Sequence, residues 1–366
     1  FLLRLRNLRN LLLVFVALYT EYSKNISKMQ GAFMEYRCIR LDIWRTPVPL
    51  PRRRGKVPQL YGGFFGQGDE SPPPLPTAKK GSFCKISPYT GVGSLYSIDF
   101  WFLGVLYLGQ QIEICGDSIV KYIEYGLKQN KTIMLLHGGG LAPWNYSEEA
   151  EQLQDRYHII IPILDGHSGS DKNFTTIENN GDEIIAYIDQ NLNGKVFMIC
   201  GLSLGGQILT DVLAKRKDIC KYAIIESALI LPMRVTYALI QPVFSLCYVL
   251  IKKRWFAQLQ FKSLHIKGSL FEDYYRDSAA ITKENMISFL KANSDYKPKE
   301  DLKESQASVL VLVGSKESGI MKKSAKLLCE KIPNSTLEML PGYYHGDLSL
   351  NHASEYVQKI EKYISK

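Results

Sequence analysis

The sequence predicts an α/β fold, with a mostly parallel sheet covered by helices on both faces. Three observations support this. From about residue 106 onward, short apolar runs alternate with helix-forming stretches. Glycine-rich turns follow several of these runs, and 46% of the residues are hydrophobic. With 366 residues, the chain is long enough for one large domain and a further segment.

The alternation begins with two predicted strands, 106–115 and 118–125, joined by the turn Gly116-Asp117. Six further strands are expected over 132–136, 158–164, 196–200, 222–226, 309–313 and 336–340. Helices are expected over 148–157, 176–191 and 207–214. Ligands bind beyond the carboxyl ends of the strands in such sheets, so the turns after these strands are where a site is expected.

Residues 227–304 interrupt the alternation and predict a helical cap inserted before the strand 309–313. The insertion opens on a 15-residue apolar and aromatic run, 237–251, which is shorter than the roughly 20 residues that span a bilayer. Pro242 is expected to interrupt that run. We interpret the insertion as a lid over the site. A face that touches a membrane stays open as an alternative.

Residues 1–105 show no domain signature. They begin with Phe, and Arg4, Arg6 and Arg9 precede a nine-residue apolar run, 11–19, that resembles a signal or anchor but is short and lacks a small-x-small cleavage site. The stretch 47–88 is rich in proline, which is typical of disorder. We expect 1–105 to be a disordered or non-native extension and 106–366 to be the functional domain.

Charge and cysteine content exclude several classes of function. The formal net charge is +9, but residues 1–105 hold 15 Lys/Arg and 6 Asp/Glu, whereas residues 106–366 hold 30 of each. A neutral functional domain without a basic stripe argues against nucleic-acid binding. The seven cysteines include neither a C-x-x-C pair nor a metal-type spacing. We expect free thiols, a cytoplasmic location, and neither a metal nor an organic cofactor.

The most informative motif is Gly201-Leu202-Ser203-Leu204-Gly205-Gly206, between the predicted strand 196–200 and the predicted helix 207–214. A strand, G-x-S-x-G and a helix in this order predict a sharp turn that exposes a nucleophilic serine, Ser203. Glycines two residues before and after Ser203 fit the crowding in such a turn.

Serine needs a general base, and the base needs a group that orients it. His345 is the predicted base, because it follows the last predicted strand in a glycine-containing loop. The rival His167 lies in the earlier loop 165–170, where it is expected to brace the site. Glu317, just after the strand 309–313, is the predicted orienting acid. Glu226, at the end of the neighbouring strand, is the rival acid.

An oxyanion requires backbone N–H donors. The amide of Leu204, at the start of the helix after Ser203, is expected to supply one, and the amide of Gly139 the second, with Gly140 as the alternative. The run 137–140 lacks the Lys-Ser/Thr of a phosphate-binding P-loop, so a nucleotide site is not expected.

Together these segments resemble the α/β-hydrolases of the esterase and lipase type. The resemblance covers roughly residues 106–366 and is carried by five segments in the family's order: 136–140, 165–170, 201–206, 313–317 and 341–345. One departure is Glu317, where Asp is more usual. The resemblance implies the α/β-hydrolase fold and a catalytic triad of Ser203, His345 and Glu317.

The resemblance also implies a function, namely hydrolysis of an ester through an acyl-enzyme. The apolar insertion favours a hydrophobic acyl or aromatic ester, a small molecule, as substrate. Peptidase, thioesterase, lactonase and C–C hydrolase chemistry use the same triad and stay open, as does a non-catalytic ligand receptor on this fold. The serine at the elbow argues against epoxide and haloalkane hydrolysis, which related enzymes perform with Asp.

Overall fold

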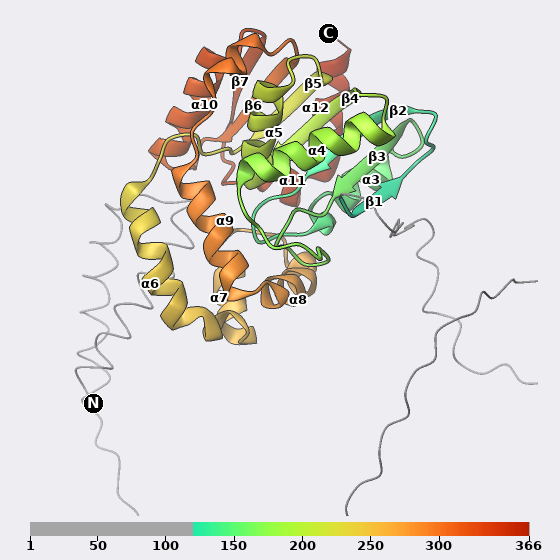
Figure 1. Ribbon diagram of the computed structural model, residues 1–366. Coiled ribbons are helices and arrows are strands. Elements are labelled where there is room, and N and C mark those ends of the chain that lie inside the picture. Colours follow the sequence, from blue (N-terminus) through green and yellow to red (C-terminus); the bar gives the residue numbers. More distant parts are fainter. Residues whose placement is uncertain (1–119, 366) are drawn as a thin grey trace, which may run out of the picture. The chain divides into compact units, whose positions relative to one another are not determined.

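The computed structural model describes residues 120–365. The expectations for residues 1–105, and the strand and turn expected within 106–119, lie outside the described residues. The part described begins just before the first strand of the sheet and ends at the last helix (Figure 1).

A seven-stranded sheet forms the centre of the described domain, in the order β1-β3-β2-β4-β5-β6-β7. Only β1 is antiparallel to its neighbour; the other pairs are parallel. The central strands are almost wholly buried, as expected for a parallel sheet covered on both faces. The strands are β1 (Tyr122–Tyr125), β2 (Lys131–Leu136), β3 (Tyr157–Pro162), β4 (Val196–Leu202), β5 (Cys220–Glu226), β6 (Ser308–Gly314) and β7 (Ser335–Leu340).

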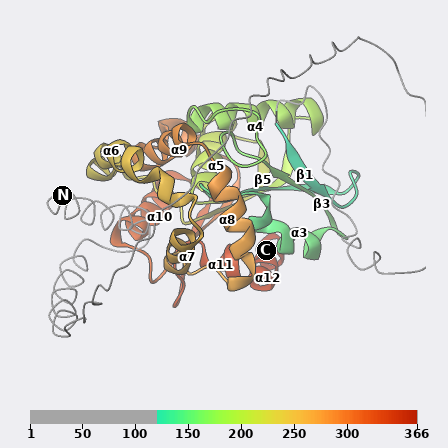
Figure 2. The same ribbon diagram turned by 90° about the horizontal axis from the view of Figure 1, so that it is seen from below.

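Helices cover both faces of the sheet, and each face has its own core. One core packs α4 (Ile177–Asn191), α5 (Leu204–Lys215) and α10 (Gly319–Lys331) against the strands. The other packs α3 (Ser147–Leu153) and α12 (Ala353–Ile364), which lie side by side on the opposite face (Figure 2). The predicted α/β class and the α/β-hydrolase arrangement are confirmed.

Several expected boundaries were wrong: the strand expected over 158–164 ends at Pro162, the helix expected over 207–214 begins at Leu204, and two further cases have a clear physical reason. The helix expected over 148–157 ends at Leu153, and Tyr157 instead begins β3, where it pairs with Lys131 of β2. Backbone pairing in the sheet thus outweighed the helical pattern at this end. The strand expected over 196–200 continues to Leu202, because Gly201 and Leu202 still pair with Ile225 and Glu226 of β5.

The chain between β5 and β6 forms a helical insertion. Its elements are α6 (Arg234–Ile251), α7 (Arg254–Ser263), η2 (Gly268–Leu270), α8 (Phe271–Ala280), α9 (Lys283–Asp295) and η3 (Glu300–Glu304). Helix α6 packs against α9 at the outer side of the domain (Figure 1). Pro242 lies inside α6 without ending it. By length and composition α6 could cross a membrane, although a third of it is buried in the domain.

Candidate active site

The turn between β4 and α5 holds Ser203 in a strained conformation. Its φ is 52° and its ψ −110°, in a region that L-residues rarely adopt. A Cβ on Gly201 would come within 2.5 Å of the Gly205 carbonyl oxygen, and one on Gly205 within 2.2 Å of the Leu136 carbonyl oxygen. Both positions therefore exclude side chains, as the motif predicted.

Three side chains from distant parts of the chain meet above this turn. The His345 Nε2 atom lies 3.1 Å from the Ser203 Oγ atom. On the other side of the ring, Nδ1 lies 2.9 Å from Oε2 of Glu317. Ser203 follows β4, Glu317 follows β6 and His345 lies in the loop after β7, so the parallel sheet brings the three to one edge.

Glu317 is buried, and both of its carboxylate oxygens accept hydrogen bonds. Its Oε1 accepts hydrogen bonds from the Gly314 amide at 2.7 Å and from the Ser227 hydroxyl at 2.8 Å. Ser227 also accepts a hydrogen bond from the Gly346 amide at 3.3 Å, so it links the acid to the loop that carries His345. Sequence reasoning missed Ser227. Its only signal was its place directly after a predicted strand, and its φ of 53° is visible only in the structure.

Glu226, the rival acid, lies in the same region but does not contact His345 by a hydrogen bond. Its Oε1 accepts a long bond of 3.4 Å from the Ser349 amide, and Oε2 has no hydrogen-bond partner among residues 120–365. Complete burial raises the pKa of Glu226 to about 7, and the nearby charge of Glu317 adds to the increase. Of the two candidates, the structure brings only Glu317 into contact with the imidazole.

The two amides predicted to face an oxyanion flank Ser203. Leu204 is the first residue of α5, so its N–H has no partner within the helix. Gly139 packs against it: a Cβ on Gly139 would lie 3.4 Å from the Leu204 side chain. The alternative donor, Gly140, gives its N–H to Nε2 of His167 at 3.0 Å. The Gly140 amide is thus occupied within the protein, which leaves Gly139 as the better candidate.

Two buried histidines hold the glycine loop in place. His167 accepts from Gly140, and its Nδ1 donates to the Asp165 carbonyl at 3.0 Å. His137 accepts from the Leu164 amide through Nε2 and donates to the Gly138 carbonyl through Nδ1. Burial lowers the pKa of His137 to about 3 and that of His167 to about 4, so both are neutral near pH 7. His167 therefore braces the site, as expected.

A cavity of about 80 Å³ lies over Ser203 and His345. Gly138 and Gly139 line it from the glycine loop, and the helical insertion supplies much of the rest. Its walls are mainly apolar: Leu141, Leu202, Leu264, Ile266, Phe289, Leu290 and Leu350. The cavity can accept an uncharged group close to the serine hydroxyl.

Among residues 120–365, no group of three or more His, Cys, Asp or Glu side chains is arranged to hold a metal ion. The four cysteines of this part, Cys200, Cys220, Cys247 and Cys329, are free thiols.

Comparison with known proteins identifies the class. Residues 133–358, more than half of the chain, match the alpha/beta hydrolase family, and the chain belongs to it. A search of curated proteins finds no match.

Solved structures share the fold at low sequence identity. A thermophilic esterase from Thermogutta terrifontis is 18% identical, with a TM-score of 0.55 over 67% of this chain and 93% of the esterase. An esterase from Exiguobacterium antarcticum is 16% identical, with a TM-score of 0.58 over 68% of this chain and 96% of the esterase. A bromoperoxidase from Bacillus anthracis is 17% identical, with a TM-score of 0.57 over 68% of this chain and 96% of that protein. At these identities the likeness establishes the fold alone.

Proposed function

We propose that the protein is a serine hydrolase that cleaves a carboxylic ester through an acyl-enzyme. Ser203 attacks the ester carbonyl while His345 takes its proton through Nε2. Glu317 accepts the Nδ1 proton in a hydrogen bond and stabilises the imidazolium that forms. The alcohol leaves with the proton from His345, and water then releases the acid by the same steps.

The observation that carries this proposal is the continuous chain from Ser203 Oγ through the His345 ring to Glu317, with contacts of 3.1 and 2.9 Å. A nucleophile, a base and an orienting acid at hydrogen-bond distance are the parts that acyl transfer requires. The amides of Leu204 and Gly139 are proposed to bind the oxyanion, where each donor is worth about 3 kcal/mol in the transition state.

The cavity supports an uncharged acyl group as the part of the substrate next to Ser203. Its apolar walls, which include Leu290 and Ile266, would bury hydrocarbon and offer a charged group little compensation. A volume of about 80 Å³ suits a short acyl chain in the structure as it stands. We therefore expect acetyl and butyryl esters to be preferred over long-chain esters.

The proposal can be tested with p-nitrophenyl esters of increasing acyl length and the full chain. Ser203→Ala should lower kcat at least about 10⁴-fold, because the nucleophile is lost. Ser269→Ala, an exposed serine of the insertion, is the matched control and should retain full activity. Labelling of Ser203 by a fluorophosphonate provides a second readout.

Three results would change the conclusion. Equal turnover by wild type and Ser203→Ala would exclude the serine mechanism. Labelling of Ser203 without turnover of any p-nitrophenyl ester would indicate another acyl substrate, such as a thioester, lactone or peptide. If the folded protein is not labelled and turns over no ester, a ligand receptor is favoured instead.

A further inference from the structure

Helix α6 has two apolar faces, and only one of them is covered. Thr236, Ile240, Val243, Phe244 and Cys247 are buried in the domain, where α6 packs against α9. The opposite face carries a second apolar row, the exposed stripe: Val235, Leu239, Pro242, Leu246 and Val249. At 3.6 residues per turn these five positions lie within roughly 80° of arc, so they form one continuous face.

The exposure of this helix is unusual for the domain. Nine large hydrophobic side chains are exposed among residues 120–365, and seven of the nine lie between residues 235 and 259. Val235 is 71% exposed, Val249 65% and Leu246 52%. Tyr237 and Trp255, with apolar rings and a polar atom, are exposed in the same segment. A concentration of this kind marks a surface that binds another apolar phase or molecule.

The charge of residues 227–271 indicates what kind of surface this apolar stripe binds. From residue 227 to residue 271 the sequence contains no Asp or Glu, and it contains six basic residues: Arg234, Lys252, Lys253, Arg254, Lys262 and Lys267. The segment therefore carries +6, within a region, 106–366, that is neutral overall. The basic residues bracket α6, with Arg234 at its start and a basic turn, Lys252, Lys253 and Arg254, at its end.

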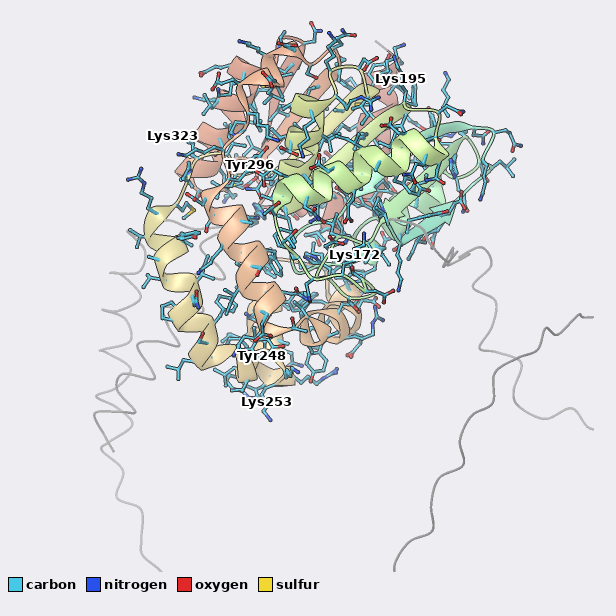
Figure 3. The ribbon with its side chains drawn as sticks, viewed as in Figure 1. Lys172, Lys195, Tyr248, Lys253, Tyr296 and Lys323 are labelled. Carbon is cyan, nitrogen blue, oxygen red and sulfur yellow. The ribbon has the colours of Figure 1, made fainter. Side chains whose placement is uncertain are left out.

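Part of this charge is available to a partner. Arg254 pairs with Glu272, and Lys267 with Glu148. Lys252, Lys253 and Lys262 form no ion pair with any residue of the described domain. Lys253 lies at the end of the insertion remote from the sheet, and its side chain points away from the domain (Figure 3).

We propose that the exposed stripe of α6 and the adjacent basic turn dock the protein onto the surface of an anionic lipid bilayer. The helix would lie in the plane of the interface, with its stripe in the acyl boundary and its lysines against anionic headgroups. A transmembrane orientation does not fit, because the other face of α6 is packed on the domain. A second copy of the chain fits less well, since it would bring two sets of like charges together.

The test is co-sedimentation of the full chain with vesicles of phosphatidylcholine alone and with 30% phosphatidylserine. Binding should be stronger to the anionic vesicles and should weaken as salt is raised. Leu246→Glu/Val249→Glu should weaken partitioning at least about tenfold, because two charges would enter the apolar boundary. Lys252→Gln/Lys253→Gln should weaken it about tenfold on anionic vesicles and leave binding to neutral vesicles unchanged.

Leu127→Glu is the matched control, because Leu127 is 59% exposed in the turn between β1 and β2, outside the insertion. It should bind as wild type does. The melting temperature of each variant establishes that it is folded. Because the experiment measures vesicle binding, the docking proposal holds or fails independently of the proposed esterase chemistry.

Two outcomes would overturn the proposal. One is that the wild-type protein stays in solution with both kinds of vesicle. If wild type is then a dimer in solution and Leu246→Glu/Val249→Glu is a monomer, the stripe binds a second copy of the chain. The other is Leu246→Glu/Val249→Glu protein that binds vesicles as well as wild type does, which would assign docking to another segment, such as the apolar run 11–19.

Discussion

Two buried carboxylates lie at the carboxyl ends of adjacent strands, and their surroundings differ. Glu226 is the last residue of β5, and Glu317 follows β6. Both are at most 3% exposed. Three hydrogen-bonding groups meet the oxygens of Glu317: the Gly314 amide, the Ser227 hydroxyl and the His345 ring. Glu226 has one long bond to the Ser349 amide and an oxygen without a partner in the described domain.

The difference shows that burial by itself does not decide what a carboxyl group can do. The donors around Glu317 compensate its oxygens for the water lost on burial, so it can orient and stabilise a cationic imidazole. Glu226 accepts only a long hydrogen bond from Ser349 in the described domain, and burial raises its pKa to about 7. Two acids that both stand at the ends of predicted strands therefore differ in chemistry.

The largest expected effect comes from exchanging the acid that contacts the imidazole. Glu317→Gln should lower kcat about 10⁴-fold, because the amide cannot stabilise the imidazolium and offers a donor to Nδ1. Glu226→Gln is the matched change one strand away and should keep kcat within about threefold. Steady-state kinetics on p-nitrophenyl acetate measure both. The opposite ranking would make Glu226 the catalytic acid.

The second prediction concerns stability and pH. The pKa of Glu226 is about 7 in the folded protein and about 4.5 in the unfolded chain, so between these values the folded state binds more protons. Its contribution to the free energy of unfolding therefore falls as pH rises from about 4.5 to 7, by about 3 kcal/mol in all.

Glu226→Gln removes this loss. The variant should match wild type in urea unfolding at pH 4.5 and exceed it by about 3 kcal/mol at pH 8. A difference between the two proteins that does not change with pH would show that Glu226 titrates normally in the folded state.

A smaller effect is expected from Ser227→Ala, which removes one donor to Glu317 and the acceptor for the Gly346 amide. A hydrogen bond to a charged group is worth roughly 1.5–3 kcal/mol, so kcat should fall at least about tenfold. Ser318→Ala is the control, because that buried hydroxyl has no hydrogen-bond partner in the described domain. Equal kcat values for the two variants would remove Ser227 from the set of positioning residues.

Much of the fold could be predicted from the sequence, because its signals are local. Each of the six strands predicted from 132–136 to 336–340 is a strand of the sheet, and Gly201 and Gly205 identified the turn around Ser203. The family assignment, which rested on motifs in order, is confirmed. The expected catalytic roles of Ser203, His345 and Glu317 stay predictions until the kinetics are measured.

Sequence alone thus determined the strands, the turn at Ser203 and the residues that stand at strand ends, because periodicity and glycine sterics act over a few neighbouring residues. Only the tertiary structure decided which carboxylate meets His345, that Ser227 supports it, and that the Gly140 amide is already bound by His167. It also decided which apolar face of α6 is covered. These contacts join residues far apart in the chain. They depend on strand order and helix packing, which local sequence patterns do not encode.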